Sequence, residues 1–143
     1  MSMNILIPVD LAHEEELPVL IKAACQLVGD RPEARFDLLY VDDSLIHKAG
    51  SPHVDPTREK ERRQEVKTHL TALIQQHMPA QYRYDCHVRR GSIHEQILEE
   101  AQKVKADTIV MMAQKPGIGS YFVGSNAERV VRHAHCSVMV LRS

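Results

Sequence analysis

Short apolar segments alternate with longer segments of helical period along the chain, and this alternation limits the fold more than any other feature. The segments predicted as strands are Asn4–Asp10, Arg35–Val41, Tyr82–Val88, Asp107–Ala113 and Ser137–Arg142. Between them, residues 16–30, 57–77, 91–104 and 125–134 carry apolar side chains at helical spacing and are predicted helices. Such alternation predicts an α/β fold, a doubly wound five-stranded parallel sheet with right-handed crossovers and helices on both faces.

The composition of the strand segments predicts where each one lies in the sheet. "NILIPVD" and "DTIVMMA" are almost continuously apolar, as is typical of strands that are buried on both faces. "YRYDCHV" alternates polar and apolar residues, which favours the edge of the sheet. Parallel sheets bind ligands outside the carboxyl ends of their strands, so we expect the functional residues at 8–10, 41–43, 89–91 and 112–115.

Size and charge exclude several classes of protein. A chain of 143 residues predicts a single domain spanning residues 1–143. The 18 basic and 19 acidic residues give a formal charge of −1, which offers no electrostatic basis for binding nucleic acid or an anionic membrane. No apolar run approaches the roughly 20 residues of a membrane span. The 3 cysteines are widely spaced and are predicted to be reduced thiols, so we expect a cytoplasmic protein.

A glycine-rich segment leads from the fourth strand into the last helix. Gly117, Gly119 and Gly124 allow tight turns and a close approach of the backbone to a ligand. The helix that follows begins near Ser125, and its first turn offers unpaired N–H groups that suit a phosphate. The alternative is a capping box, in which Ser125 caps the helix and Glu128 reaches back. The two interpretations are compatible, and the segment lacks the Gly-Lys-Ser/Thr ending of a Walker A motif.

Other polar residues at strand ends have two interpretations each. Asp10 is expected either to accept hydrogen bonds from a ribose or adenine, or to cap the loop before the first helix. Asp42 and Asp43 are expected to be a solvated pair, with Mg²⁺ held through water as the alternative. "HAHC" at 133–136 lacks the spacing of a zinc site, so we predict no metal ligands there. No nucleophile, base and orienting group stand together, so we predict no catalytic residues.

Three stretches resemble the universal stress protein family, in its small single-domain bacterial branch. They are "ILIPVD", "GSIHEQILEEAQKVKADTIVMMA" and "VGSNAERVVRHAHCSVMVLR", and the resemblance extends over essentially the whole chain. It implies a Rossmann-like fold, similar to the adenine nucleotide alpha hydrolases. Many members of the family bind ATP or AMP, form homodimers through their last strands and act in stress resistance, with no metabolic reaction assigned.

Nucleotide-binding members carry Gly-x2-Gly-x9-Gly-Ser/Thr after the fourth strand. Gly124 and Ser125 match its end, whereas Ala113 replaces the first glycine and Pro116 the second, and the following gap is two residues shorter. Gly117 and Gly119 are then the glycines available from shifted positions. The resemblance places Pro8, Val9, Asp10, Val41 and Met112 around adenine and ribose, Gly124, Ser125 and Asn126 at the phosphate, and Ala113, Lys115 and Gly117 along the loop.

The sequence therefore predicts a cytoplasmic stress protein that binds ATP or AMP, with Mg²⁺ as a further component. It predicts a homodimer formed through Val138, Val140 and Leu141, because an apolar edge strand pairs readily with another strand. The alternative for these three residues is that they fill the core of their own domain. The alternative functions are an interaction module without nucleotide and a slow ATPase that uses Asp10 with Asp42 or Asp43.

Overall fold

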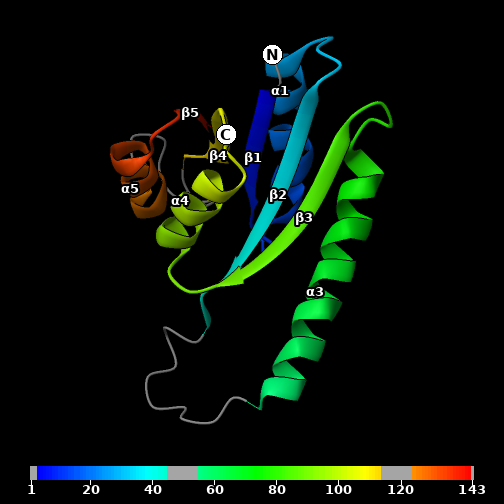
Figure 1. The fold of residues 1–143 in the computed structure, drawn as a ribbon, viewed down its shortest axis with the longest axis vertical. Helices are drawn as coiled ribbons and strands as arrows, with labels where there is room; N and C mark the ends of the chain where they lie inside the picture. The colour runs from blue at the N-terminus through cyan, green and yellow to red at the C-terminus, as the bar shows by residue number, and fades with distance from the viewer. Residues whose placement is uncertain (1–2, 45–54, 114–123, 143) are drawn as a thin grey trace.

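The predicted α/β architecture is confirmed by a computed structural model, which describes residues 3–44, 55–113 and 124–142 (Figure 1). The elements in chain order are β1 (Met3–Val9), the short 3₁₀ helix η1 (Glu14–Glu16), α1 (Leu17–Val28), β2 (Ala34–Asp42), α3 (Pro56–His77), β3 (Arg83–Arg90), α4 (Ile93–Lys103), β4 (Thr108–Met112), α5 (Ser125–His133) and β5 (Ser137–Leu141). Strand and helix alternate as the sequence pattern requires.

All strands pair in parallel in the order β3-β2-β1-β4-β5. The chain builds β1, β2 and β3 outward in one direction and then crosses β1 to place β4 on its other side. The polar, alternating strand β3 lies at an edge of the sheet, as its composition predicts. The strand order reverses between β1 and β4, which is where a doubly wound sheet binds its ligands.

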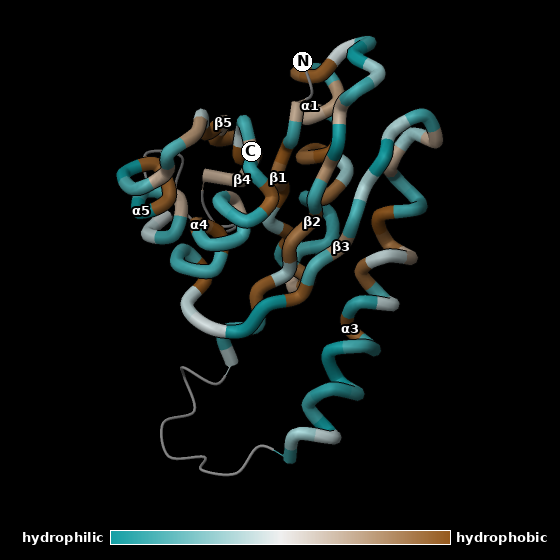
Figure 2. The backbone as a smooth tube through the Cα atoms, viewed as in Figure 1, coloured by the Kyte–Doolittle hydropathy of each residue, from teal (hydrophilic) through white to brown (hydrophobic). Residues whose placement is uncertain are grey.

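Two apolar cores hold the helices against opposite faces of the sheet. Ile5, Ile7 and Val9 point to the face that α1 and α3 cover, whereas Leu6 points to the face under α4 and α5. This alternation follows from the two-residue period of a strand. Figure 2 shows the apolar segments gathered on the sheet and on the helix faces turned toward it. The central strands are thus buried on both faces, which their continuous apolar sequences predict.

The helix ends follow local sequence signals with one exception. Gly29 ends α1 with φ 63°, a left-handed conformation that glycine adopts without a steric penalty. Asp55 caps α3 by accepting a hydrogen bond of 3.0 Å from the backbone N–H of Thr57. The exception is Ser92, which occupies the N-cap position of α4 without capping the helix, because its hydroxyl hydrogen-bonds His94 Nδ1 instead. Ser92 and Glu95 have the spacing of a capping box, but the box is not formed.

None of the helices in the described ranges is long and apolar enough to cross a membrane. Cys25, Cys86 and Cys136 are unpaired, which agrees with their prediction as thiols. Burial raises the pKa of each of these thiols above its ordinary value, which favours the protonated form at neutral pH.

Candidate functional site

The strands β1 and β4 separate toward their carboxyl ends. β1 pairs with β2 along its whole length, from Met3 to Val9, but its pairing with β4 covers only Ile5 and Leu6. If the register of that pairing continues, Asp10 lies level with Ala113 beyond the last paired residues. The β1–β4 ladder thus stops short of the carboxyl ends of both strands, at the point where the strand order reverses and where this fold binds ligands; we call this place the crevice.

The start of α5 is held at the carboxyl end of β4 by backbone hydrogen bonds. The N–H of Gly124 donates a hydrogen bond of 2.6 Å to the carbonyl of Ala113, whose own N–H donates to the carbonyl of Leu141 at 2.7 Å. These bonds bring the last helix to the ends of β4 and β5. Gly124 and the end of β4 therefore lie side by side.

The predicted capping box at α5 is wrong. Gly124 occupies the N-cap position, Ser125 is the first helical residue, and no side chain in the described ranges caps the helix. Glu128 does not reach back, because its carboxylate pairs with Arg132 at 2.8 Å. The N–H groups of Ser125, Asn126 and Ala127 thus lie in a first turn without a side-chain cap, which is the arrangement that binds anions at helix starts.

Asp10 lies at the end of β1 and already serves its own loop. One carboxylate oxygen accepts a hydrogen bond of 2.9 Å from the N–H of Ala12, and the backbone carbonyl accepts one of 3.0 Å from His13. The other carboxylate oxygen lies 4.0 Å from His13 Nε2. Asp10 therefore orders the turn after β1, as one interpretation from the sequence expects, whereas its contact with a ribose or adenine stays a prediction.

Val41 is buried near the end of β2, and the next residue, Asp42, connects three parts of the chain. Its carbonyl accepts a hydrogen bond of 3.1 Å from Gly91 in the turn after β3. Its carboxylate accepts one of 3.0 Å from the N–H of Ser44 and lies 3.7 Å from the guanidinium of Arg62 on α3. Asp42 is thus partnered by its own chain, which corrects its interpretation as one half of a solvated pair.

The pKa values near Asp42 follow from these partners. Burial acts to raise the pKa of Asp42, but the hydrogen bonds from Ser44 and the charges of Arg62 and Arg90 outweigh burial and lower the pKa below its ordinary value. Burial raises the pKa of Tyr40, and the charges of Asp42, Asp43 and Asp10 raise it further. Asp42 is therefore a carboxylate whose charge is held by neighbouring arginines, beside a tyrosine that stays protonated.

The other predicted site residues divide into two groups. Pro8 and Met112 are half-buried near the crevice, and Val9 and Ala113 are buried there. Lys115 and Gly117 lie outside the described residues, as does the rest of the shortened loop. Residues of β5 belong to a different surface, at the sheet edge opposite β3.

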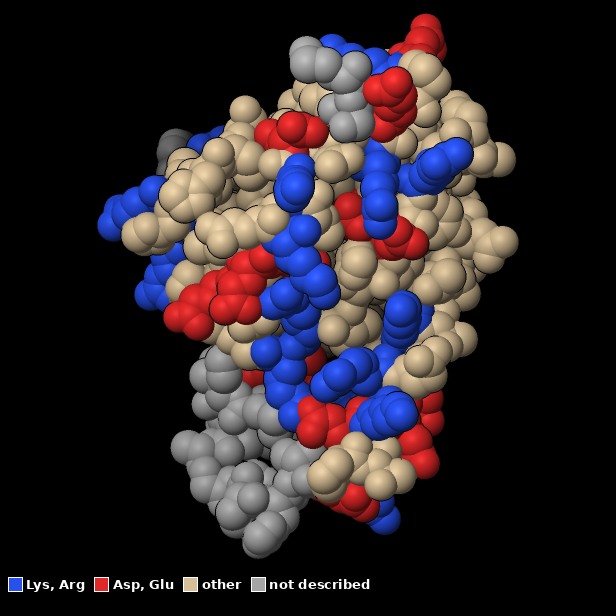
Figure 3. Space-filling model, viewed as in Figure 1, with Lys and Arg blue, Asp and Glu red and all other residues tan. Residues whose placement is uncertain are grey.

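The sequence did not predict the polar contacts that lie on the α4 face of β2 and β3. Asp37 is 1% exposed, and its Oδ1 lies 2.7 Å from His87 Nε2. Arg89 donates to the buried carboxylate of Glu100 at 3.0 Å and to Glu99 at 2.8 Å. Figure 3 shows basic side chains in a stripe flanked by acidic ones across this view of the molecule. The only sequence signal was a charged residue within the apolar segment "RFDLLYV".

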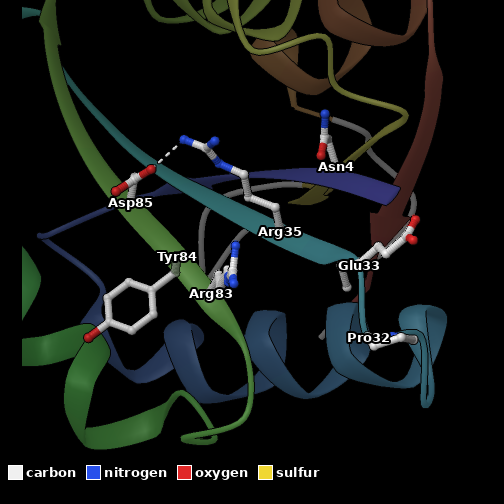
Figure 4. Close-up of a pocket in the computed structure, with 8 residues that line it drawn as sticks. Asn4, Pro32, Glu33, Arg35, Arg83, Tyr84 and Asp85 are labelled. Atoms are coloured by element: carbon white, nitrogen blue, oxygen red, sulfur yellow. Dashed lines mark hydrogen bonds and ion pairs between the residues drawn. The ribbon is translucent and has the colours of Figure 1, made fainter. Parts of the chain in front are cut away.

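A groove of about 600 Å³ lies at the opposite, amino-terminal end of the strands. Figure 4 shows Arg35 and Asp85 in contact across it, with Asn4, Glu33 and Arg83 around its wall. It lies away from the carboxyl ends where parallel sheets bind ligands. Arg35 and Asp85 in it already pair with each other, so volume alone does not make it the functional site.

A doubly wound sheet with a helix starting beside the carboxyl ends of its strands places backbone donors where α/β proteins bind ligands. The sequence model of the universal stress protein family matches residues 1–142. Universal stress protein G of Salmonella typhimurium is 33% identical over 154 residues, which cover 99% of this chain and 100% of that protein. The chain therefore belongs to the universal stress protein family.

Solved structures share the fold at lower identity. The hypothetical protein MJ0577 superimposes with a TM-score of 0.79 at 21% identity, covering 100% of this chain and 97% of that chain. A universal stress protein of Archaeoglobus fulgidus in complex with dAMP has a TM-score of 0.58 at 18% identity, covering 97% of each chain. A universal stress protein in complex with cAMP has a TM-score of 0.57 at 13% identity, covering 99% of this chain and 97% of that chain.

Proposed function

We propose that this chain is a cytoplasmic stress protein that binds an adenine nucleotide, AMP or ATP, in the crevice between β1 and β4. The observation that carries the proposal is the start of α5, where Gly124 is tied to Ala113 and no described side chain caps the first turn. Two proteins of the same family and fold were solved with dAMP and cAMP, which supports an adenine nucleotide as the ligand.

The charges around the crevice support one orientation of the ligand. Phosphates carry negative charge and are repelled by the carboxylate of Asp10 at the end of β1. The first turn of α5 carries partial positive charge and attracts them. In the proposed orientation the phosphate therefore lies at Ser125 and Asn126, and adenine and ribose lie toward Val41 and the free oxygen of Asp10. Lys115 and Gly117 extend the phosphate end in this proposal, and Mg²⁺ accompanies ATP.

Calorimetric titration with AMP and with ATP plus Mg²⁺ tests this function directly. We expect saturable binding by the wild type and a loss of at least about tenfold in affinity for Asp10→Ala, because the ribose contact is removed. Lys22→Ala on the outer side of α1 is a matched surface control and should bind as the wild type does. Absence of binding to either nucleotide, together with no nucleotide released from the purified protein, would favour the interaction module instead.

We also propose a homodimer through β5. This strand lies at the sheet edge, and Val138, Val140 and Leu141 are each only partly buried within their own chain. Pairing with a second copy would cover their exposed parts and satisfy the open edge. Light scattering should give the mass of a dimer for the wild type and a monomer for Val140→Lys, whereas a monomeric wild type at micromolar concentration would refute the dimer.

A further inference from the structure

The first half of α3 projects beyond the cores that hold the rest of the helix. Residues 56–65 contain no buried side chain, and packing into the apolar core begins at Leu70, which is fully buried, as is Ile74. Figure 2 shows this half as hydrophilic, with apolar positions confined to the later turns. We call residues 56–65 the arm. An arm of this length extends about 15 Å, and a helical segment so short is marginal in water without support.

Charged contacts supply the support that apolar packing does not. Glu59 pairs with Arg90 at the end of β3, and Arg63 lies 3.8 Å from the same carboxylate. Arg62 lies 3.7 Å from Asp42 at the end of β2. Glu59 and Asp42 are each 17% exposed, so the two carboxylates are partly withdrawn from water while their arginine partners reach outward.

These contacts meet the sheet at one place, beside the proposed nucleotide site. Asp42 and Arg90 are register partners in the β2–β3 ladder, and Val41 directly precedes Asp42. The same Asp42 holds the backbone of Ser44 and Gly91. A change in the arm's contacts at Asp42 therefore acts on the end of β2 that carries Val41.

We propose that the arm is a charge-held element that positions the Val41 side of the nucleotide site, so that affinity for adenine compounds falls when its ion pairs are screened or removed. The proposal rests on the proposed function for its readout. Arg62 is then a positioning residue that acts through Asp42. Exposed ion pairs are individually weak and sensitive to salt, which makes the arm responsive to the ionic strength of its surroundings.

Adenosine is the sharpest probe because it carries no phosphate, so salt does not screen its own charge. We expect wild-type affinity for adenosine to fall about two- to fivefold between low and high salt, the range for weak ion pairs. Arg62→Gln should show the reduced affinity already at low salt and lose the salt dependence. Arg62→Lys should restore both, because it keeps the charge. Arg58→Gln removes a charge one turn earlier on the arm and should match the wild type.

Amide hydrogen exchange tests the arm without any ligand. We expect amides within residues 59–66 to exchange faster in high salt and in Arg62→Gln, while those within residues 70–77 stay protected by the core. Equal adenosine affinities for Arg62→Gln and Arg58→Gln, or exchange in the arm that ignores both salt and Arg62, would overturn the proposal. If the wild type binds neither adenosine nor AMP, the proposed function and the coupling fail together, while the exchange result still decides whether charge holds the arm.

Discussion

The two ends of the parallel strands differ in whether their polar groups are already hydrogen-bonded within the chain. At the amino-terminal end, the side chain of Asn4 donates hydrogen bonds of 3.3 Å to the carbonyls of Val104 and Lys105, and Arg35 pairs with Asp85. At the carboxyl end, the first turn of α5 after Gly124 has no capping side chain from the described residues. At the amino-terminal end these polar groups bond to other groups of the chain. At the carboxyl end the backbone N–H groups at the start of α5 have no side-chain partner among the described residues.

This difference shows that the size of a cavity and the presence of groups able to bind a ligand are separate properties. The groove of about 600 Å³ lies at the end where Arg35 and Asp85 already pair with each other. The crevice between β1 and β4 has backbone donors that need a partner and a helix dipole that favours an anion. We therefore expect substitutions away from the carboxyl end to leave nucleotide binding unchanged and substitutions beside the start of α5 to reduce it.

The largest effect is expected for His87→Ala, which leaves the buried carboxylate of Asp37 without its hydrogen-bond partner. Because one oxygen of Asp37 already lacks a hydrogen bond, we expect a loss of about 3 kcal/mol in the free energy of unfolding. Urea unfolding measures this loss, and His87→Gln should recover part of it through its amide donor. The affinity of the folded variant for AMP should be unchanged. A loss of AMP binding without a loss of stability would contradict the proposed separation between stability and binding.

The second effect concerns binding alone. Gly124 has φ −59°, which any residue adopts, so Gly124→Val should fold normally. Its branched side chain would stand where a phosphate approaches the first turn of α5, and we expect AMP affinity to fall at least tenfold, or about 1.4 kcal/mol. Calorimetry tests the expected loss of AMP affinity, and thermal unfolding tests whether the variant folds normally. Unchanged affinity would remove Gly124 from the site.

A third, smaller effect is expected for Asp42→Asn, and it depends on pH. The pKa of Asp42 is lowered in the folded chain, so its contribution to stability is complete at neutral pH and is lost as the pH falls through that lowered value. We expect the wild type to be more stable than Asp42→Asn by about 1 kcal/mol at neutral pH. Denaturant unfolding should show this difference shrinking below about pH 4, and an equal difference in acid would contradict the assignment.

The smallest effect is expected for Arg132→Gln on the outer face of α5. Its ion pair with Glu128 spans 2.8 Å between two exposed side chains one turn apart. Such pairs contribute about 0.3–0.5 kcal/mol, so thermal unfolding should change little. AMP affinity should stay the same, and a clear loss would mean that Arg132 belongs to the phosphate end of the site.

Sequence patterns predicted the features that depend on local periodicity. Three such features are the apolar run of β1, the alternation in β3 and the glycine at position 29. Each depends on the surroundings of a single element, so the edge position of β3 and the end of α1 could be predicted. The capping of α5 could not, because Ser125 and Gly124 compete for one position and only the bond from Gly124 to Ala113 decides between them.

Contacts between residues far apart in the sequence could not be predicted from the local pattern of apolar and polar residues. Asp37 and His87 are 50 residues apart and meet only through the β2–β3 register. Asp42 meets Arg62 only because α3 extends past the sheet, a feature of length and packing rather than of local sequence. Pairing partners of buried charges therefore require the fold, even where the charged residue itself stands out in an apolar segment.

Amide chemical shifts during titration of the ¹⁵N-labelled protein with AMP test the central claim most directly. The account predicts saturable shifts for Ser125, Asn126 and Ala127 at the start of α5 and for Asp10 at the end of β1, with no change at Asn4 and Arg35. Shifts confined to the amino-terminal end of the strands, or no shift at α5 while AMP binds, would contradict it.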